Sequence, residues 1–370
     1  MKNLYKSQFV FFALLLCCVG TFIHITPTEA VNLDNPHYQP KEEKQKVIKA
    51  TFKVDSKDVL QISNKYGNVN FSNHDKNEVS VQVTVLAWAR SEKEAQKMLD
   101  RISIDQEKSS EGVSFATEIE ESKGGYDCNQ REGFEINYEV KIPKNLNVDV
   151  DNKFGSVTFS DLNGKLTLNL KHGNFNAHNL TGVRHNINVQ FGNLSANEIH
   201  SADIYVAHGS INIDKSNADL NIDSKHSNVR IDEANKLQIN AKHGNMRIGT
   251  VSQIFGENKF GTIEVRKVLK SAVLDLKHGN CQIEQVAKGF EKIDVENAHG
   301  GIELRFDADA AFEFEARTEH GSIRNSMPNT KIRVQQDDDH DKILEGTTNG
   351  GKNGKVRVVN QHGSIRLEER

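Results

Sequence analysis

Cysteine and proline are scarce in this sequence, with four cysteines and five prolines among 370 residues. Cys17 and Cys18 lie in an apolar N-terminal segment, so Cys128 and Cys281 alone remain for the folded protein. These two lie far apart in the chain and show none of the close spacings of zinc sites. We therefore expect both to be unpaired and expect no metal to be bound through cysteine.

An excess of charge of one sign and long apolar runs are also missing. The formal net charge is -4 and no long basic run occurs, which excludes a nucleic-acid-binding protein. Beyond the N-terminus, no segment approaches the roughly 20 apolar residues that cross a bilayer. We therefore expect no transmembrane span in the mature chain.

The N-terminus has the layout of a secretory signal peptide, which we place at residues 1–30. Two lysines precede an apolar run over residues 9–19, and Ala30 closes a cleavage motif of small residues. The mature chain is expected to begin near Val31 with a linker over residues 31–49. This leader predicts an exported protein, periplasmic or on the cell surface.

A lipid anchor would need a cysteine that follows a small residue. Leu16 precedes Cys17, and Cys17 precedes Cys18, so neither cysteine has that context. We expect the exported product to be soluble.

A ring residue followed by glycine, once by serine, recurs along the chain. From Phe154 to His278 the steps are 17 to 19 residues, the next two are 21, and the last gap of 42 is twice 21. The ring positions are Tyr66, Phe154, His172, Phe191, His208, His226, His243, Phe260, His278, His299, His320 and His362. The bend glycines that follow them are Gly67, Gly155, Gly173, Gly192, Gly209, Gly244, Gly261, Gly279, Gly300, Gly321 and Gly363, with Ser227 as the exception. So regular a period indicates a repeat architecture.

The side-chain pattern within one period predicts two short strands joined at the glycine. Leu166, Leu168, Leu170 and His172 share one face of a strand, and after Gly173 the inward role passes to Phe175 and Ala177 with opposite parity. This parity places the rings inward, which predicts neutral histidines and a fold that loses stability in acid.

Units this small cannot bury an apolar face alone, so they must stack about 4.8 Å apart. We predict an all-β fold, a single-stranded β-solenoid (β-helix) with coils of about 17–21 residues over residues 146–370. A β-propeller is the competing fold, but its blades need roughly 40 residues or more.

Residues 50–145 depart from the repeat and predict an N-terminal β-rich cap. Ser91 and Glu94 form a capping box that predicts one short helix over residues 91–101. Strands are expected on either side of this helix. Such a region would cover the open end of the solenoid.

The run EINYEVKIPKNLNVDVDNKFGSVTFSDLNGKLTLNLKHGNF and the closing segment from Ile343 resemble the bacterial "putative adhesin" family of exported β-solenoid repeat proteins, a domain of unknown function. The resemblance covers about residues 50–370. It implies a β-solenoid, a location in the cell envelope, and an adhesive or scaffolding role. It assigns no active site.

The recurring histidines allow two interpretations, a row of metal ligands or a packing ladder. Phe or Tyr fills the same position in four coils and cannot bind a metal. Rings about 4.8 Å apart also fit badly around one zinc ion, whose nitrogen ligands lie at about 2.1 Å. We therefore favour a ladder of stacked planar rings and expect no metal and no cofactor. We expect His340, in the acidic run 337–341, to be solvated.

A carbohydrate-active β-helix enzyme, such as a polysaccharide lyase or hydrolase, is the alternative function. Its site would need paired carboxylates converging on a groove. The acidic residues look scattered here, for example Asp214, Asp223 and Asp232, and no catalytic residues are assigned. The sequence thus predicts a non-catalytic, adhesin-like binding or scaffolding protein of the envelope, whose partner is an envelope protein or a glycan.

Overall fold

The computed structural model describes residues 42–120, 132–351 and 353–370. The expected signal peptide, its cleavage site, residues 31–41 of the linker and Cys128 lie outside these ranges. Within them, Cys281 is a free and buried cysteine. No helix in the described ranges combines the length and the apolar character that crossing a bilayer requires.

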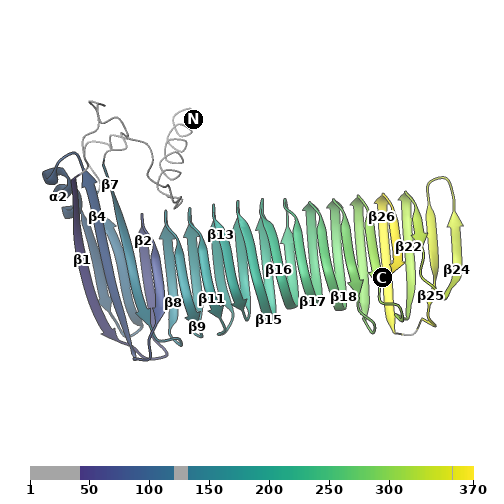
Figure 1. Cartoon of the computed structure of the whole chain (residues 1–370), viewed down its shortest axis with the longest axis horizontal. Helices are drawn as coiled ribbons and strands as arrows, with labels where there is room; N and C mark the ends of the chain where they lie inside the picture. Colours follow the sequence, from purple (N-terminus) through teal and green to yellow (C-terminus); the bar gives the residue numbers. More distant parts are fainter. Residues whose placement is uncertain (1–41, 121–131, 352) are drawn as a thin grey trace, which may run out of the picture.

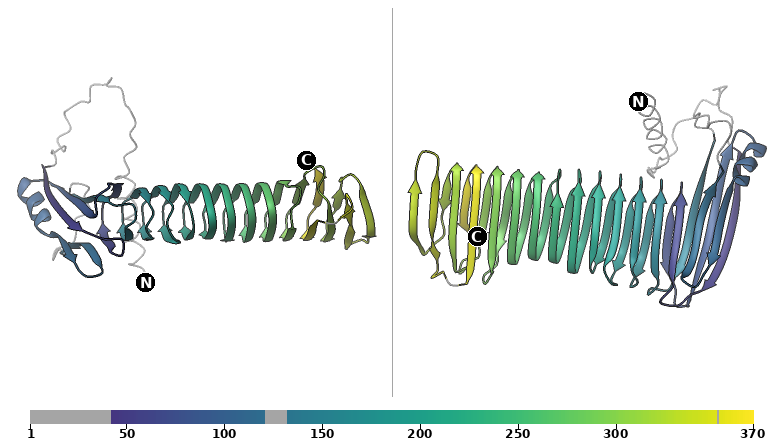
Figure 2. Two further views of the ribbon diagram at one scale, coloured as in Figure 1. Left: turned by 90° about the horizontal axis from the view of Figure 1, so that it is seen from below. Right: turned by 180° about the vertical axis from the view of Figure 1, so that it is seen from behind.

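The described chain forms a long rod whose strands run across the rod axis (Figure 1). Seen from below, the strands make two thin layers joined by bends at both edges (Figure 2). In the part that the structure describes, 27 strands are hydrogen-bonded into one mixed sheet, and one short helix accompanies them. The prediction of an almost entirely β protein with one short helix is confirmed.

Each repeat unit, which we call a coil, contributes one strand to each layer. The leading layer contains the strands that end at a ring residue, and the trailing layer those that start after the bend. The leading strands are β2 (Val59–Lys65), β8 (Asn147–Lys153), β10 (Leu166–Lys171), β12 (His185–Gln190) and β14 (Ala202–Ala207). The trailing strands are β3 (Val69–Asn73), β9 (Val157–Leu162), β11 (Phe175–Leu180) and β13 (Asn193–Ile199).

In the middle of the rod, a trailing strand continues into the next leading strand without a break. These long strands are β15 (Ser210–Lys225), β16 (Asn228–Ala241), β17 (Met246–Phe260) and β18 (Ile263–His278). The remaining coil strands are β19 (Cys281–Val286), β20 (Lys292–His299), β21 (Ile302–Phe306), β22 (Phe312–His320), β23 (Ile323–Asn325), β26 (Gly354–His362) and β27 (Ile365–Glu369).

Successive coils pair in parallel and in register. Leu168 lies opposite Val150 on one side and Ile187 on the other, 18 residues earlier and 19 later. Equivalent residues therefore form columns along the rod, and neighbouring columns along a strand face alternately the core and the outer surface. The apolar columns, such as Val150, Leu168 and Ile187, meet between the two layers as one continuous core.

The N-terminal cap closes one end of the rod and pairs with the first coil, β2–β3. Its elements are β1 (Glu42–Lys53), β4 (Glu78–Ala89), α2 (Glu92–Asp100), β5 (Ile102–Lys108), β6 (Gly112–Ile119) and β7 (Gly133–Ile142). Ser91 caps α2 by accepting the N–H of Glu94 at 3.3 Å, as its capping box predicts. Coil β2–β3, in the middle of the region expected to be the cap, pairs with β6 and β7 on one side and with β8 and β9 on the other.

At the C-terminal end the coils do not stack in sequence order. The last coil, β26–β27, lies between β20–β21 and β22–β23 (Figure 1). After β20–β21 the chain skips one coil position and forms β22–β23 beyond it. The hairpin of β24 (Thr330–Asp337) and β25 (Lys342–Thr348) follows, and β26–β27 then occupies the skipped position. The final strands thus gain a hydrogen-bonded neighbour on both sides. The interval of 42 residues contains this hairpin as well as the coil strands β23 and β26.

The exposed edge at this end belongs to β24. Lys331 and Arg333 lie on it, and its pairing with β25 is irregular between Ile332 and Val334. Charges and bulges on an edge strand discourage pairing with another sheet. The hairpin therefore ends the rod.

Among the described residues, one histidine lies fully in the core. His185 is fully buried, and its Nδ1 accepts the backbone N–H of Leu166 at 3.1 Å. The next residue in its column, Ala202, is small and leaves room for the ring. Burial lowers the pKa of His185 to about 4, against the backbone of Leu180, which acts to raise it.

We predict that His185 makes the fold sensitive to acid. Above pH 6.5 neither state of His185 is protonated and its contribution is complete, whereas between pH 6.5 and 4 the unfolded chain alone takes up the proton. The free energy of unfolding should fall by on the order of 3 kcal/mol across that window. Urea unfolding at several pH values, compared with His185→Leu, measures this difference. An unchanged pH dependence in His185→Leu would refute it, and His208→Phe is the control at an exposed ring.

Candidate functional site

Twelve rings form one continuous stack along an edge of the rod, which we call the ring ladder. Its members in spatial order are Tyr66, Phe154, His172, Phe191, His208, His226, His243, Phe260, His278, His299, His362 and His320. Neighbouring ring centroids are 4.6–5.1 Å apart and their planes are tilted by 2–10°. The separation of the coils sets this distance, which lies in the range of favourable ring pairs.

Both ends of the ladder are covered by a further ring. Phe134 of β7 meets Tyr66 edge-on with centroids 5.3 Å apart. His340, in the turn between β24 and β25, meets His320 edge-on at 5.1 Å. His340 is exposed in its acidic run, as expected, but it also touches the ladder. The ring faces are therefore covered along the whole ladder, and only ring edges reach solvent.

The rings point outward, which corrects the inward orientation predicted from strand parity. Phe191 and Phe260 are each 45% exposed, whereas Leu170, two residues before its ring, is buried. The reason is the backbone at the bend. Six ring residues have φ between 51° and 63°, in the left-handed region, and this turns the side chain away from the core: Tyr66, Phe154, His172, Phe191, His208 and His226. The prediction of an acid-sensitive ladder rests on the expectation that its histidines are buried. The histidine that is fully buried is His185, outside the ladder.

The bend exists in two forms that differ by one residue. In the first, the ring residue donates its backbone N–H to the next coil, as His208 does to the carbonyl of Lys225 at 3.0 Å. From His226 onward the residue after the ring donates instead, as Ser227 does to the carbonyl of His243 at 2.9 Å and Gly244 to that of Phe260 at 3.1 Å. The left-handed φ leaves the ring residue one coil later, since His226 still has φ 51° and Gly244 has φ +145°.

Glycine is required at the bend mainly because the coils approach closely there. A Cβ on Gly192 would lie 1.8 Å from the carbonyl oxygen of Gly173 in the previous coil. Gly173, Gly192 and Gly209 have no left-handed φ, so at these positions glycine is required by the steric conflict and not by backbone strain. Ser227, the exception, is buried and accepts the N–H of Gly209 through Oγ at 3.1 Å.

The small polar residue after the glycine bonds one coil to the next. Asn174 accepts the N–H of Asn193 through Oδ1 at 3.0 Å, and Asn228 accepts that of Asn245 at 3.0 Å. Inside the bend, buried asparagines play a matching part that the sequence analysis missed. Asn297, for example, donates Nδ2 to the carbonyl of Gly279 at 2.9 Å. A pattern in the sequence points to these asparagines, since asparagine recurs two residues before several ring residues.

The ladder geometry does not favour a shared metal ion. Adjacent imidazoles are parallel, whereas the ligands of one zinc ion must converge on it at about 2.1 Å. Among residues 42–120, 132–351 and 353–370, no group of three His, Cys, Asp or Glu side chains is placed to hold a metal. Partial burial, helped by the charge of Lys171, lowers the pKa of His172, which favours its neutral form at neutral pH.

Lysines flank the ladder on the leading layer and form a lysine column. They are Lys65, Lys153, Lys171, Lys225, Lys242, Lys259 and Lys277, each directly before a ring residue. Other lysines form ion pairs, but within the described ranges none of these seven does. Lys225 instead lies 4.9 Å above the ring of Tyr205.

A shallow acidic hollow of about 430 Å³ lies farther along the same layer. Glu257, Asp275 and Glu296 line it from three successive coils, and Phe255 and Val273 add an apolar patch. Burial and the two neighbouring carboxylates raise the pKa of Asp275. The expectation of scattered carboxylates is wrong here, because residues 18 and 21 positions apart fall into one column.

The other acidic residues considered from the sequence do not converge. Asp232 is paired with Arg230 at 3.2 Å, and Asp337 in the C-terminal hairpin with Lys342 at 2.7 Å. Asp214 is exposed and Asp223 partly exposed, on opposite layers.

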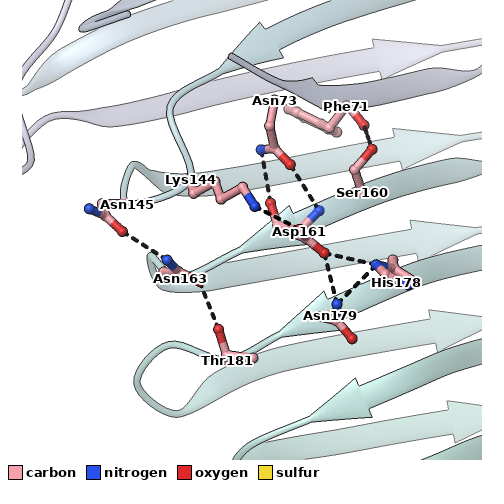
Figure 3. Close-up of polar contacts among 10 residues, drawn as sticks. All are labelled: Phe71, Asn73, Lys144, Asn145, Ser160, Asp161, Asn163, His178, Asn179 and Thr181. Atoms are coloured by element: carbon pink, nitrogen blue, oxygen red, sulfur yellow. Dashed lines mark hydrogen bonds and ion pairs between the residues drawn. The ribbon is translucent and has the colours of Figure 1, made fainter. Parts of the chain in front are cut away.

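A polar cluster around Asp161 connects the first coils at the bend opposite the ladder (Figure 3). The Asp161 carboxylate contacts Lys144 Nζ and His178 Nδ1, both at 2.9 Å. These hydrogen bonds lower the pKa of Asp161 to about 2. An Asp–His pair could orient a base, but the adjacent hydroxyl of Ser160 donates to the carbonyl of Phe71 at 3.3 Å. The cluster thus bonds coils together.

Comparison with known proteins identifies one family. A family model described as Toastrack DUF4097 matches residues 57–368, which confirms the resemblance found in the sequence. No curated protein matches the chain in sequence.

Solved bacterial structures resemble the chain at low identity. One, titled "a putative adhesin" from Parabacteroides merdae ATCC 43184, is 9% identical, with 87% of this chain and 96% of that chain covered and a TM-score of 0.33. Another, from Bacteroides fragilis NCTC 9343 with the same description, is 10% identical, with 88% and 97% covered and a TM-score of 0.25. A third, "a putative cell adhesion protein" from Clostridium sporogenes ATCC 15579, is 9% identical, with 88% and 100% covered and a TM-score of 0.21.

We predict that Gly192→Ala destabilises the rod by roughly 3 kcal/mol, because the new methyl would force two coils apart. Gly301→Ala is the matched control, since its Cβ would meet no atom closer than 3.6 Å and its φ is not left-handed. Urea unfolding measures both. Equal stability of the two variants would show that the coils can separate freely at the bend.

We predict that His226→Ala weakens the fold by on the order of 1–2 kcal/mol, since the ring stacks on two neighbours. His226→Phe should be close to neutral, because Phe occupies the same position at Phe191 and Phe260. EDTA should leave the melting temperature unchanged and zinc should not raise it. A lower melting temperature in EDTA would show that the ladder holds metal.

Proposed function

Since this chain belongs to the Toastrack DUF4097 family, we propose that it is an exported, non-catalytic binding or scaffolding protein of the bacterial cell envelope. In this proposal residues 146–370 act as a β-solenoid, a stiff rod that presents its long sides, and residues 50–145 act as its cap. The leader and the adhesin-like sequence support export and an adhesive role.

The observation that carries the proposal is the regularity of the rod's sides. Parallel columns place the same kind of group at successive coils, as in the lysine column beside the ring ladder, where Lys65, Lys153 and Lys171 follow one another. A repetitive surface of this kind suits a long or repetitive partner, which many weak contacts can hold at once. An envelope glycan has such a repeat.

The acidic hollow favours one alternative, a polysaccharide-active enzyme. Asp275, with its raised pKa, could act as a general acid beside Glu257 or Glu296. These three side chains are exposed on an open layer, however, and no wall over them excludes water. Binding therefore explains the geometry better than catalysis.

Binding and turnover can be measured on the same material. We expect the purified mature chain to bind isolated envelope polysaccharide in biolayer interferometry, with no new reducing ends and no unsaturated products after prolonged incubation. Turnover that disappears in Asp275→Asn would replace the binding function with the enzyme. Absence of binding to any envelope polysaccharide or surface protein would refute the proposal.

A further inference from the structure

A second hollow, of about 270 Å³, lies on the leading layer beside the ring ladder, in the first coils after the cap. It is small enough for a monosaccharide unit rather than a folded protein. Its lining comes from three successive coils: Asp151 and Lys153, then Asn169, Leu170 and Lys171, then Asn188 and Gln190.

Strand register places these side chains in two short columns. Asp151, Asn169 and Asn188 lie side by side in one, and Lys153, Lys171 and Gln190 in the next. The second column borders the ladder, because Phe154, His172 and Phe191 directly follow its members. One ligand could therefore contact three coils and the ring edges together.

The amides of the hollow are linked in a chain that leaves donors free. Gln190 Nε2 donates to Asn188 Oδ1 at 3.3 Å, and Asn188 Nδ2 donates to Asn169 Oδ1 at 3.4 Å. In the described part of the protein, no partner is found for Asn169 Nδ2 or for the ammonium groups of Lys153 and Lys171. The hollow thus offers more donors than acceptors.

Two neighbouring unpaired lysines are unfavourable without an anion. Like charges directly opposite on adjacent strands repel, and no residue of the hollow neutralises Lys153 and Lys171 by an ion pair. Elsewhere charged side chains of neighbouring coils form ion pairs, as Arg247 does with Glu264 on the trailing layer and Arg357 with Asp294 on the leading layer, both at 3.0 Å. A bound carboxylate would supply the missing counter-charge through charge-assisted hydrogen bonds.

The single acidic side chain of the hollow, Asp151, further limits which ligands can bind there. Asp151 can only accept hydrogen bonds and would repel a ligand that carries anionic groups on every side. A ligand with one carboxylate and several hydroxyls satisfies both the lysines and Asp151. We propose that this hollow binds a uronic-acid unit of an acidic polysaccharide, its carboxylate at Lys153 and Lys171 and its hydroxyls at Asp151, Asn169 and Gln190.

This assignment rests on the proposed binding function and specifies its ligand. Tetragalacturonate, cellotetraose and inorganic phosphate serve as probes in isothermal titration calorimetry with the mature full chain. We expect binding of tetragalacturonate that weakens as salt is added, and no binding of cellotetraose.

The decisive variants change lysines of one column. Lys153→Ala with Lys171→Ala should weaken tetragalacturonate binding at least 10-fold, since two charge-assisted contacts are lost. Lys242→Ala with Lys259→Ala is the matched control, because these lysines occupy the same column outside the hollow, and it should leave affinity unchanged. All four side chains are at the surface, and melting temperatures verify that both variants fold.

Several outcomes would overturn the assignment. Equal losses in the two double variants would indicate a diffuse cationic surface, and equal binding of cellotetraose would remove the role of the carboxylate. Phosphate that binds as tightly and depends on the same lysines would make the hollow a simple anion site. Binding of another envelope ligand that ignores Lys153 and Lys171 would refute this site but leave the proposed function intact.

Discussion

Parallel hydrogen bonding between coils is the constraint on which the rest of this structure depends. A coil of two short strands has no core of its own, so its backbone groups and its apolar side chains both require a neighbour. In-register pairing satisfies both needs and repeats every side chain at the same place in the next coil. The ring ladder, the asparagines of the bend and the lysine column are all consequences of that single register.

The same constraint makes the two ends a problem, because each terminal coil has one unpaired edge. At the N-terminal end, β6 and β7 pair with the first coil, and β1, β4 and α2 extend the cap. At the C-terminal end, the chain places its last coil between two others and leaves the hairpin β24–β25 outside. Phe134 and His340 complete these caps by covering the terminal rings of the ladder.

Register also turns a repetitive sequence into local sites of different character. Near the cap, Lys153 and Lys171 lie beside amides in a donor-rich hollow. Farther along the same layer, Glu257, Asp275 and Glu296 form an acidic hollow with an apolar patch. In the proposed binding function, a rod with such segments would contact different parts of a partner at different positions along its length.

The sequence by itself determined the period, the paired strands, the glycine bend, the stack of rings and the capped helix at Ser91, because each depends on local spacing and residue type. Only the tertiary structure decided the direction of the rings, since strand parity through Leu170 cannot reveal that the backbone turns left-handed at His172. It also decided the one-residue change of bend that begins at His226, and the insertion of β26–β27 before β22–β23. The tertiary structure also decided the columns that contain Asp275 and Lys171. The register between coils determines which residues lie side by side, and distance along the chain does not.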